Sequence, residues 1–533
     1  MDFKKVFWPA LLILIAFIAF AQDNLPVDYL SKEFHKSRRE AFRKMMPEKS
    51  VAVIFAFPER TFSNDVTYFY HQNPDLYYLT GYKEPGAVLL LFKELQKNGD
   101  QSYNELFFVR SRDTSRETWT GKRLGADGVK EKLGITDAHD AKNFKDFPID
   151  FKAFNTVLYD YIYNDAPDDG SGCDVFGLIE SFKKKSGIIP LSVNDSKLNS
   201  NIANVQPEYL SGVIDYLKSS IAENDHLQHN IYIQRLMEKP DSTTLREIQT
   251  AIKSKKNECG DFNKIMDALR QVKTPEELVL LRKAINISSV GHAEVIKAGH
   301  SAMSENEADG IHRFIHRYYG AEDEGYPLIV GAGNNGCVLH YQSNNALRLN
   351  NDLLLMDVGA EYHGYTADIT RTFPANGKFS AEQKAIYQLV YKAQEEVFKL
   401  CKEGTRFSDL NKKASEVIAE GLLQLGIITS KEEAHTYYPH GCSHYLGLDV
   451  HDRGDYNVLL ENEVITVEPG IYIPEGSKCD KKWWNIGVRI EDDVLIKKDK
   501  YEILSGHLAR KLEDVEKLAA QKSKFNEMKL PPL

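Results

Sequence analysis

The chain has 533 residues and a mass of 60.6 kDa, with 42% hydrophobic and 27% charged residues. These fractions are typical of globular proteins and exclude disordered, collagen-like and disulfide-scaffold classes. The formal net charge of -10 argues against a nucleic-acid-binding protein, which usually carries a basic domain. At about 100–200 residues per domain, the length predicts two or three domains.

The N-terminal segment has the pattern of a secretory signal peptide. Lys4 and Lys5 precede an apolar run that ends in Ala19-Phe20-Ala21. The run is shorter than the roughly 20 residues that a membrane span needs. A basic start, an apolar core and an A-x-A end are the parts of a cleavable signal. We therefore expect residues 1–21 to be removed, a secreted or periplasmic location, and no stable membrane insertion afterwards. An uncleaved anchor is the alternative.

The first half of the remaining chain predicts an α/β domain. A basic helix is expected over residues 31–46, and apolar runs at 51–57, 87–92 and 105–109 predict buried strands. Strands that alternate with helical segments are typical of a covered sheet. Residues 160–260 are more polar and are the least patterned part of the chain.

A domain boundary is predicted near residue 270, where signals for helix starts begin. Thr274 precedes Pro275, and Glu277 follows three residues after Thr274. This is the pattern of a capping box with proline at the first helical position. Two further helices are predicted to begin in the same way, at Ser304 and at Ser380.

Residues 331–336, GAGNNG, match the dinucleotide-binding pattern G-x-G-x-x-G. That pattern needs a helix directly after the glycines, because the helix N-terminus binds the pyrophosphate. Residues 337–341 have the character of a second strand instead. We therefore predict a hairpin turn here and no nucleotide site.

Acidic side chains occur at unexpected places in apolar strands of the C-terminal half. Asp357 ends one strand, and Asp368 lies beyond a glycine-containing turn. If that turn centres on residues 361–364, the two carboxylates face each other with Cβ atoms about 4.5–5.5 Å apart. Glu468 ends another strand, and Glu491 is expected in the middle of one. Such carboxylates are costly unless a proton or a cation compensates them, although a water-exposed hairpin end would also explain the aspartates.

Three histidines occur close together between these strands: His440, His444 and His451. With the four carboxylates they form a candidate metal site. Oxygen-rich ligand sets suit Mn²⁺ or Mg²⁺ and also accommodate Co²⁺ or Zn²⁺. Four carboxylates around one ion would leave excess negative charge. Two ions bridged by carboxylates are therefore expected, which is an arrangement of hydrolytic enzymes.

The acidic and histidine motifs resemble the ligand series of the pita-bread metallopeptidases. The order is Asp357, Asp368, His444 in HGCSHYLGLDVHD, Glu468 in VEPG and Glu491 in RIED. The likeness is strongest to the aminopeptidase P family, with prolidases next, and it spans about residues 270–510. Segments 65–91 and 112–125 resemble the smaller domain of the same family.

This resemblance implies an α/β (α+β) protein with two domains. A creatinase-like N-terminal domain is expected over residues 30–265 and a pita-bread catalytic domain over 266–515. A tail follows at 516–533.

The resemblance also implies a role for each site residue. Asp357 would bind one metal ion, Asp368 and Glu491 both ions, and His444 and Glu468 the other. Glu468 would also be the general base. Two divalent ions are implied, with manganese expected first. The other implied residues serve the substrate or a proton relay: His340 for the oxyanion, His451 for the substrate carbonyl, His440 for the proline pocket, and Tyr472, Arg489 and Asp65 for the relay.

The activity implied is release of the first residue from peptides with proline in second position. A hydroxide bridging the two metal ions would attack the bond, because coordination lowers the pKa of water. Peptides that begin Xaa-Pro are the expected partners, and a homo-oligomer is compatible with the family. Two alternatives stay open: a prolidase, which cleaves Xaa-Pro dipeptides, and a pseudo-peptidase that binds peptides without cleaving them.

Overall fold

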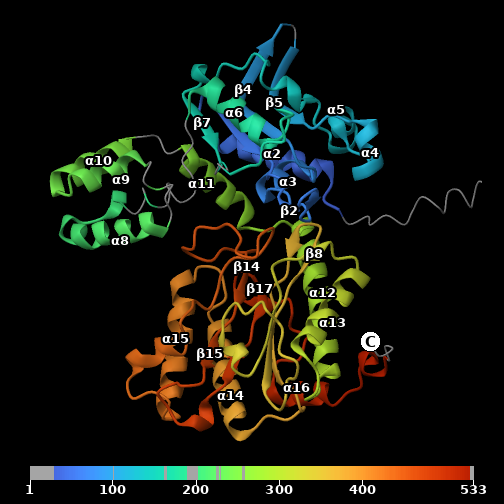
Figure 1. The fold of residues 1–533 in the computed structure, drawn as a ribbon, viewed down its shortest axis with the longest axis vertical. Helices are drawn as coiled ribbons and strands as arrows, with labels where there is room; N and C mark the ends of the chain where they lie inside the picture. The colour runs from blue at the N-terminus through green and yellow to red at the C-terminus, as the bar shows by residue number, and fades with distance from the viewer. Residues whose placement is uncertain are drawn as a thin grey trace, which may run out of the picture.

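A computed structural model gives the fold of the protein, which has an upper and a lower lobe in the view of Figure 1. The residues that it describes are 29–99, 101–160, 162, 165–188, 198, 202–223, 227, 230–254 and 258–528. The expected signal peptide lies outside them. Among the described helices, none is both long and apolar enough to cross a membrane.

The upper, N-terminal lobe is built on one five-stranded sheet with the order β6-β5-β4-β1-β7. The strands are β1 (Ser50–Phe55), β4 (Val88–Asn98), β5 (Gln101–Val109), β6 (Ala138–Asp140) and β7 (Thr156–Tyr159). Strand β1 is antiparallel to β4 and parallel to β7. The strands predicted from the three apolar runs are confirmed. Strand β1 is buried throughout, as expected for a central strand of a covered sheet.

The predicted basic helix is also confirmed as α2 (Lys32–Met45), which begins after the N-cap Ser31. Its charged residues do not all face water. Arg39 and Arg43 reach the carboxylate of Glu105 on β5, at 2.9 and 3.1 Å. The helix therefore binds the sheet through ion pairs as well as through its apolar face.

Residues 160–260 are more regular than the sequence suggested. They form the helices α6 (Val175–Ser186), α8 (Leu210–Glu223), α9 (Ile231–Glu238), α10 (Ser242–Ser254) and α11 (Glu258–Arg270). Helices α8 to α10 project to one side of the lobe in Figure 1 and share a small apolar core of their own. The helical pattern is weak in the sequence because few apolar residues at helical spacing are enough for a core this small.

The lower, C-terminal lobe places helices around several short antiparallel sheets. In Figure 1, α12 (Pro275–Ala298) and α13 (Glu305–Tyr318) flank the strands on one side, and α14 (Ala381–Phe398) and α15 (Phe407–Gln424) lie on the other. The capping boxes predicted at the starts of α12, α13 and α14 are all present. Helix α16 (Leu512–Ala519) follows the last strand.

The strands of this lobe fall into four groups. One contains β9 (Ile329–Ala332), β10 (Leu353–Asp357) and β13 (Thr370–Pro374), and a second contains β8 (Asp323–Glu324), β11 (Ala360–Tyr362) and β12 (Tyr365–Thr366). The others contain β14 (Val464–Val467), β17 (Asp492–Ile496) and β18 (Tyr501–Ile503), and the pair β15 (Gly470–Ile473) and β16 (Ile486–Arg489).

The glycine-rich segment 331–336 does not open a long helix. Residues Asn335–Cys337 form a single 3-10 turn, and turns follow to residue 340. The geometry that a bound pyrophosphate needs is missing, in agreement with the prediction. The strand expected over 337–341 is wrong, and with it the predicted hairpin, because the chain continues in turns to residue 340 and places His340 at a cavity instead.

Candidate active site

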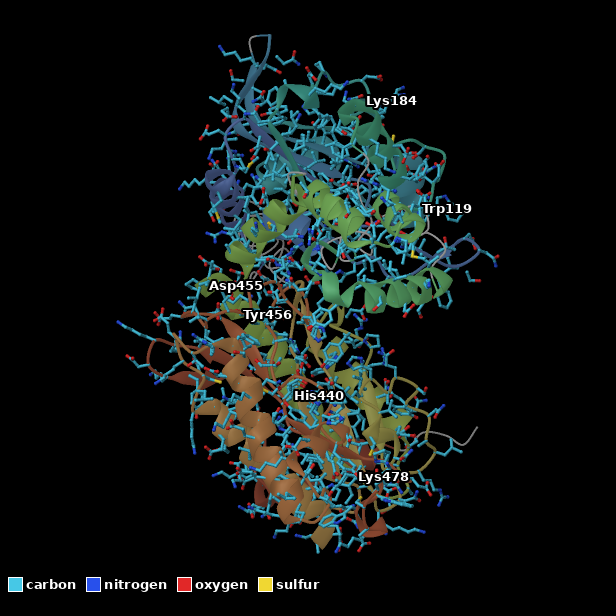
Figure 2. The ribbon with its side chains drawn as sticks, turned by 90° about the vertical axis from the view of Figure 1, so that its left-hand side faces the viewer. Trp119, Lys184, His440, Asp455, Tyr456 and Lys478 are labelled. Carbon is cyan, nitrogen blue, oxygen red and sulfur yellow. The ribbon has the colours of Figure 1, made fainter. Side chains whose placement is uncertain are left out.

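Several segments of the C-terminal lobe converge on one cavity of about 340 Å³. Its walls include the five predicted metal ligands and four other predicted site residues: Asp357, Asp368, His444, Glu468 and Glu491, with His340, His440, His451 and Arg489. Figure 2 shows His440 in the lower lobe. Residues that are far apart in sequence thus meet at one place, as the ligand series predicts.

Each carboxylate ligand lies at the end of a strand or beside one. Asp357 closes β10, Asp368 lies between β12 and β13, and Glu468 follows β14. The expectation that Glu491 lies mid-strand is wrong, because the strand is interrupted at residues 490–491, between β16 of the β15–β16 pair and β17 of another sheet. The hydroxyl of Thr370 donates to the Glu491 carboxylate at 2.6 Å and holds it at this break.

The predicted hairpin register is shifted by two residues. Asp357 pairs with Thr370, not with Asp368. The reason is a two-residue turn at His363-Gly364, where both residues have positive φ, in place of the longer turn expected. Asp368 is therefore a diagonal neighbour of Asp357 on the same face, which still lets the two side chains converge.

Tyr326 joins these two aspartates and was missed in the sequence. Its hydroxyl lies 2.6 Å from Asp357 Oδ1 and 2.6 Å from Asp368 Oδ1. One phenol thereby fixes the facing oxygens of two ligands. A tyrosine between two short strands carries no signal of such a role, so sequence reasoning had nothing to detect.

The carboxylate cluster needs positive charge. Burial is the largest influence on the pKa of Glu468, which it raises to about 7. Burial, and then the charge of Asp357, raises the pKa of Asp368 well above its usual range, and burial with the charge of Asp368 does the same for Glu491. A bound cation would reverse these shifts, because an opposite charge favours the ionised carboxylate.

The candidate ligand atoms suit a divalent cation. His444 donates from Nδ1 to the carbonyl oxygen of Tyr445 at 2.9 Å, which leaves Nε2 free as a ligand atom. That Nε2 lies 3.4 Å from Asp368 and 3.5 Å from Glu468. One ligand atom each from Asp368, His444 and Glu491 lies within 4.8 Å of the others. A buried, oxygen-rich set with one imidazole suits Mn²⁺ and similar ions.

A series of hydrogen bonds connects His440 to Asp357, the first of the predicted metal ligands. His440 Nε2 lies 2.8 Å from the hydroxyl of Tyr472, which accepts from Arg489 at 2.8 Å. Arg489 also donates to Asp357 at 2.5 Å. Tyr472 and Arg489 are both buried, and burial raises the pKa of the tyrosine to about 12. These contacts join three of the predicted relay and pocket residues.

The other two histidines lie on separate loops. The ring of His451 packs edge-on against His444, with centroids 4.3 Å apart. Burial lowers the pKa of His451 to about 4. The loop of His340 is held by the buried carboxylate of Glu305, which accepts from Ala332, Asn335, Tyr341 and Ala346 at 2.8–3.0 Å. Glu305 is a second support that the sequence did not reveal.

Asp65 lies apart from this cavity. It is exposed in the turn between β2 (Thr61–Ser63) and β3 (Val66–Thr67) of the N-terminal lobe. It is not among the residues that line the cavity. Its part in a relay stays a prediction.

Comparison with known proteins agrees with this site. Residues 279–498 match Metallopeptidase family M24, and residues 35–157 match the aminopeptidase P, N-terminal domain. The Xaa-Pro aminopeptidase of Escherichia coli (strain K12) is 33% identical over 502 residues, which are 92% of this chain and 98% of that protein. Xaa-Pro aminopeptidase 3 of Homo sapiens is 30% identical over 88% of this chain and 81% of that protein.

A solved structure of aminopeptidase P from E. coli with the inhibitor Pro-Leu has the same fold. Its TM-score is 0.70 at 29% identity, with 92% of this chain and 98% of that chain covered. The two lobes and the ligand cluster define a metallo-exopeptidase, a hydrolase that works with divalent metal ions. The chain belongs to the aminopeptidase P family of M24 metallopeptidases. The predicted family and the two-domain pita-bread fold are thereby confirmed.

Proposed function

We propose that this protein is an exported Xaa-Pro aminopeptidase, which releases the first residue of peptides with proline in second position. The observation that carries the proposal is the convergence of five ligand residues and three histidines on one cavity. The names of the relatives in E. coli and human support the same substrate class.

Two divalent cations, manganese first, are the proposed cofactors, with cobalt, zinc or magnesium as substitutes. Asp357 would bind one ion, Asp368 and Glu491 would bind both, and His444 and Glu468 would bind the other. When bound, the pair of cations supplies a water that coordination makes acidic enough to attack as hydroxide near neutral pH.

Glu468 is the proposed general base. Its carboxylate oxygens lie 3.5 Å from His444 and 3.7 Å from His440, within the cavity. From there it would take a proton from the attacking water and pass it to the leaving nitrogen.

The three histidines and the relay have proposed roles around the substrate. His340 would donate to the developing oxyanion and His451 would contact the substrate carbonyl. Burial lowers the pKa of His440 to about 4, as it does for His451, so both imidazoles are neutral at pH 7. Tyr472 and Arg489 would belong to the proposed relay, in which Arg489 stays charged and orients Tyr472 and Asp357 through the observed hydrogen bonds.

A preference for proline is consistent with the surroundings of His440. An Xaa-Pro bond has no N–H and carries a rigid ring, so its site needs flat walls and no acceptor. The ring of His440 lies with its centroid 5.0 Å from Tyr438 and 5.5 Å from Tyr472. His440 lines the cavity and would provide such a wall, and the two buried tyrosine rings pack against it.

The deciding experiment compares two peptides, the tripeptide Ala-Pro-Ala and the dipeptide Ala-Pro. The protein is assayed with Mn²⁺, and again after chelation. Release of alanine from the tripeptide, lost on chelation and restored by Mn²⁺, is the expected result. Cleavage of the dipeptide alone would replace the proposal with a prolidase, and cleavage of neither by metal-loaded protein would overturn it.

Export is tested separately on the mature chain. We expect N-terminal sequencing of the protein from its natural source to begin at Gln22, and fractionation to recover it outside the cytoplasm. A mature chain that still begins at residue 1 would contradict the proposed signal peptide.

A further inference from the structure

A buried carboxylate of the N-terminal lobe holds two arginines at the junction of the lobes. Asp75 lies in the first turn of α3 (Pro74–Thr80) and is 1% exposed. Its Oδ1 accepts from Arg270 at 2.6 Å, and its Oδ2 accepts from Arg453 at 2.6 Å. Arg270 is the last residue of α11 and is also 1% exposed, whereas Arg453 belongs to the loop after His451.

Arg270 continues the link to the catalytic loop. Its second amino group donates to Asp449 at 2.7 Å and to Asp452. The other oxygen of Asp452 accepts from Lys273 at 2.7 Å. Asp452 follows His451 directly in the chain. The residue that carries the ion-paired carboxylate is therefore bonded to the residue whose imidazole lines the cavity.

The loop itself is folded tightly onto this network. The N–H of Asp452 donates to the carbonyl oxygen of Tyr445 at 2.9 Å, which closes the loop that carries His451. Gly447 lies against the Asp452 carboxylate and leaves no room for a Cβ. Asp455 and Tyr456, which follow this loop, lie where the two lobes meet in Figure 2.

The network joins three cationic groups to several carboxylates. Asp75, Asp449 and Asp452 face Arg270, Lys273 and Arg453, and Arg453 also lies 3.5 Å from Asp160 and 3.5 Å from Asp267. A buried ion-pair network contributes little net stability compared with apolar packing, but its fixed geometry makes it a stiff connection. A stiff connection at this place sets the position of the loop relative to the N-terminal lobe.

We propose that Asp75 is a positioning residue for His451, acting through Arg270 and Asp452. The N-terminal lobe thereby determines where the imidazole of His451 stands in the cavity. Asp75 itself is absent from the cavity wall and acts at a distance from the reacting atoms. The inference rests on the proposed function, because the contact of His451 with the substrate belongs to that proposal.

A double-mutant cycle tests the proposal. Asp75→Asn, His451→Ala and the double variant are assayed for kcat/KM on Ala-Pro-Ala with Mn²⁺, at enzyme concentrations high enough to quantify the residual turnover of H451A. We expect D75N to lower kcat/KM about ten-fold or more in the wild-type background and less than two-fold in the H451A background, since coupled residues are not additive. Arg270→Lys is expected to behave like D75N.

Glu105→Gln is the matched control, because it weakens a buried arginine pair within the N-terminal lobe, far from the loop. It is expected to change kcat/KM by the same small factor in both backgrounds. Equal losses from D75N in the two backgrounds would reduce Asp75 to a structural residue and overturn the proposal, as would no loss in either. Absence of turnover in the wild-type protein would instead overturn the proposed function, so the two failures are distinguishable.

Discussion

Residues that line this site are held in place by neighbouring side chains that hydrogen-bond to them or to their loops. Tyr326 fixes two aspartates, Thr370 fixes Glu491, and Glu305 fixes the loop of His340. The supporting partners decide where the ligand oxygens stand, and they commonly matter for metal affinity nearly as much as the ligands do.

Glu468→Ala tests the proposed general base. We expect turnover of Ala-Pro-Ala to fall by about 10²–10⁴-fold, because general base catalysis is lost. The fold should survive, since removing a buried carboxylate from this cluster relieves repulsion. Steady-state kinetics with circular dichroism measure both quantities, and wild-type turnover in the variant would refute the assigned base.

Tyr326→Phe tests a residue that holds two candidate ligands in place. The change removes one hydroxyl and leaves both aspartates without their shared donor, so we expect metal affinity to fall by about 10–100-fold. Titration of Mn²⁺ into the metal-free protein gives the affinity. Tyr387→Phe is the control, because its buried hydroxyl donates to the carbonyl oxygen of Arg510 instead of to a ligand. An equal loss of affinity in both variants would contradict the role of Tyr326.

Among the elements, the hairpin between the first two ligands decides how they converge. Its two-residue turn has φ of 52° at His363 and 86° at Gly364, and it shifts the register by two residues from the one expected. Gly359 lies inside this hairpin, directly against the carbonyl group of Ala367. The backbone approach that brings Asp357 and Asp368 together therefore depends on a residue without a side chain.

Gly359→Ala is expected to separate these strands. The added methyl group would overlap the Ala367 carbonyl oxygen, so we expect a loss of about 1–3 kcal/mol in the free energy of unfolding together with a loss of bound metal. Thermal or urea unfolding and metal analysis measure the two effects. Gly310→Ala on α13, where a methyl group meets open space, should instead be neutral or stabilising by up to about 1 kcal/mol. A stable, metal-replete G359A protein would show that the close approach is dispensable.

For the whole molecule, buried histidines predict sensitivity to acid. His35 lies on the buried face of α2, with Nδ1 3.0 Å from the carbonyl oxygen of Tyr78 on α3, and burial lowers its pKa from 6.5 to about 4. The folded protein holds this imidazole neutral, whereas the unfolded chain takes up a proton below pH 6.5. Its contribution to stability is therefore complete above pH 6.5 and is lost as the pH falls toward 4.

His35→Gln should make stability less dependent on pH in this range. Between pH 6.5 and 4, the free energy of unfolding of H35Q should fall less steeply with decreasing pH than that of the wild-type protein. The expected difference between the two slopes is about 1.4 kcal/mol per pH unit. Urea unfolding at several pH values measures the slope. His300→Gln, at an exposed position, serves as the control and should leave the slope unchanged. Parallel slopes for wild type and H35Q would rule out the assigned effect.

The candidate ligands picked out from the sequence do converge on one cavity, whereas their surroundings were not predictable. The starts of α12, α13 and α14 were predictable because a capping box is a local pattern of hydrogen bonds. The ligands were predictable because carboxylates in apolar strands are costly and therefore conspicuous. The break in the strand at Glu491 was not predictable, since residues 485–496 have the same apolar pattern whether they form one strand or two.

Local chemistry thus determined which residues are candidate metal ligands, where several helices begin, and that no long helix follows the glycines at residues 331–336. Only the tertiary structure decided the register of the hairpin, the donors that fix each ligand and the link from Asp75 to His451. The reason is that a phenol between two carboxylates and an ion pair across two lobes join residues far apart in sequence, and that a hairpin register is set only when its two strands pair. The stabilisation from these contacts depends on burial and on close approach in three dimensions, and no short stretch of sequence contains that information.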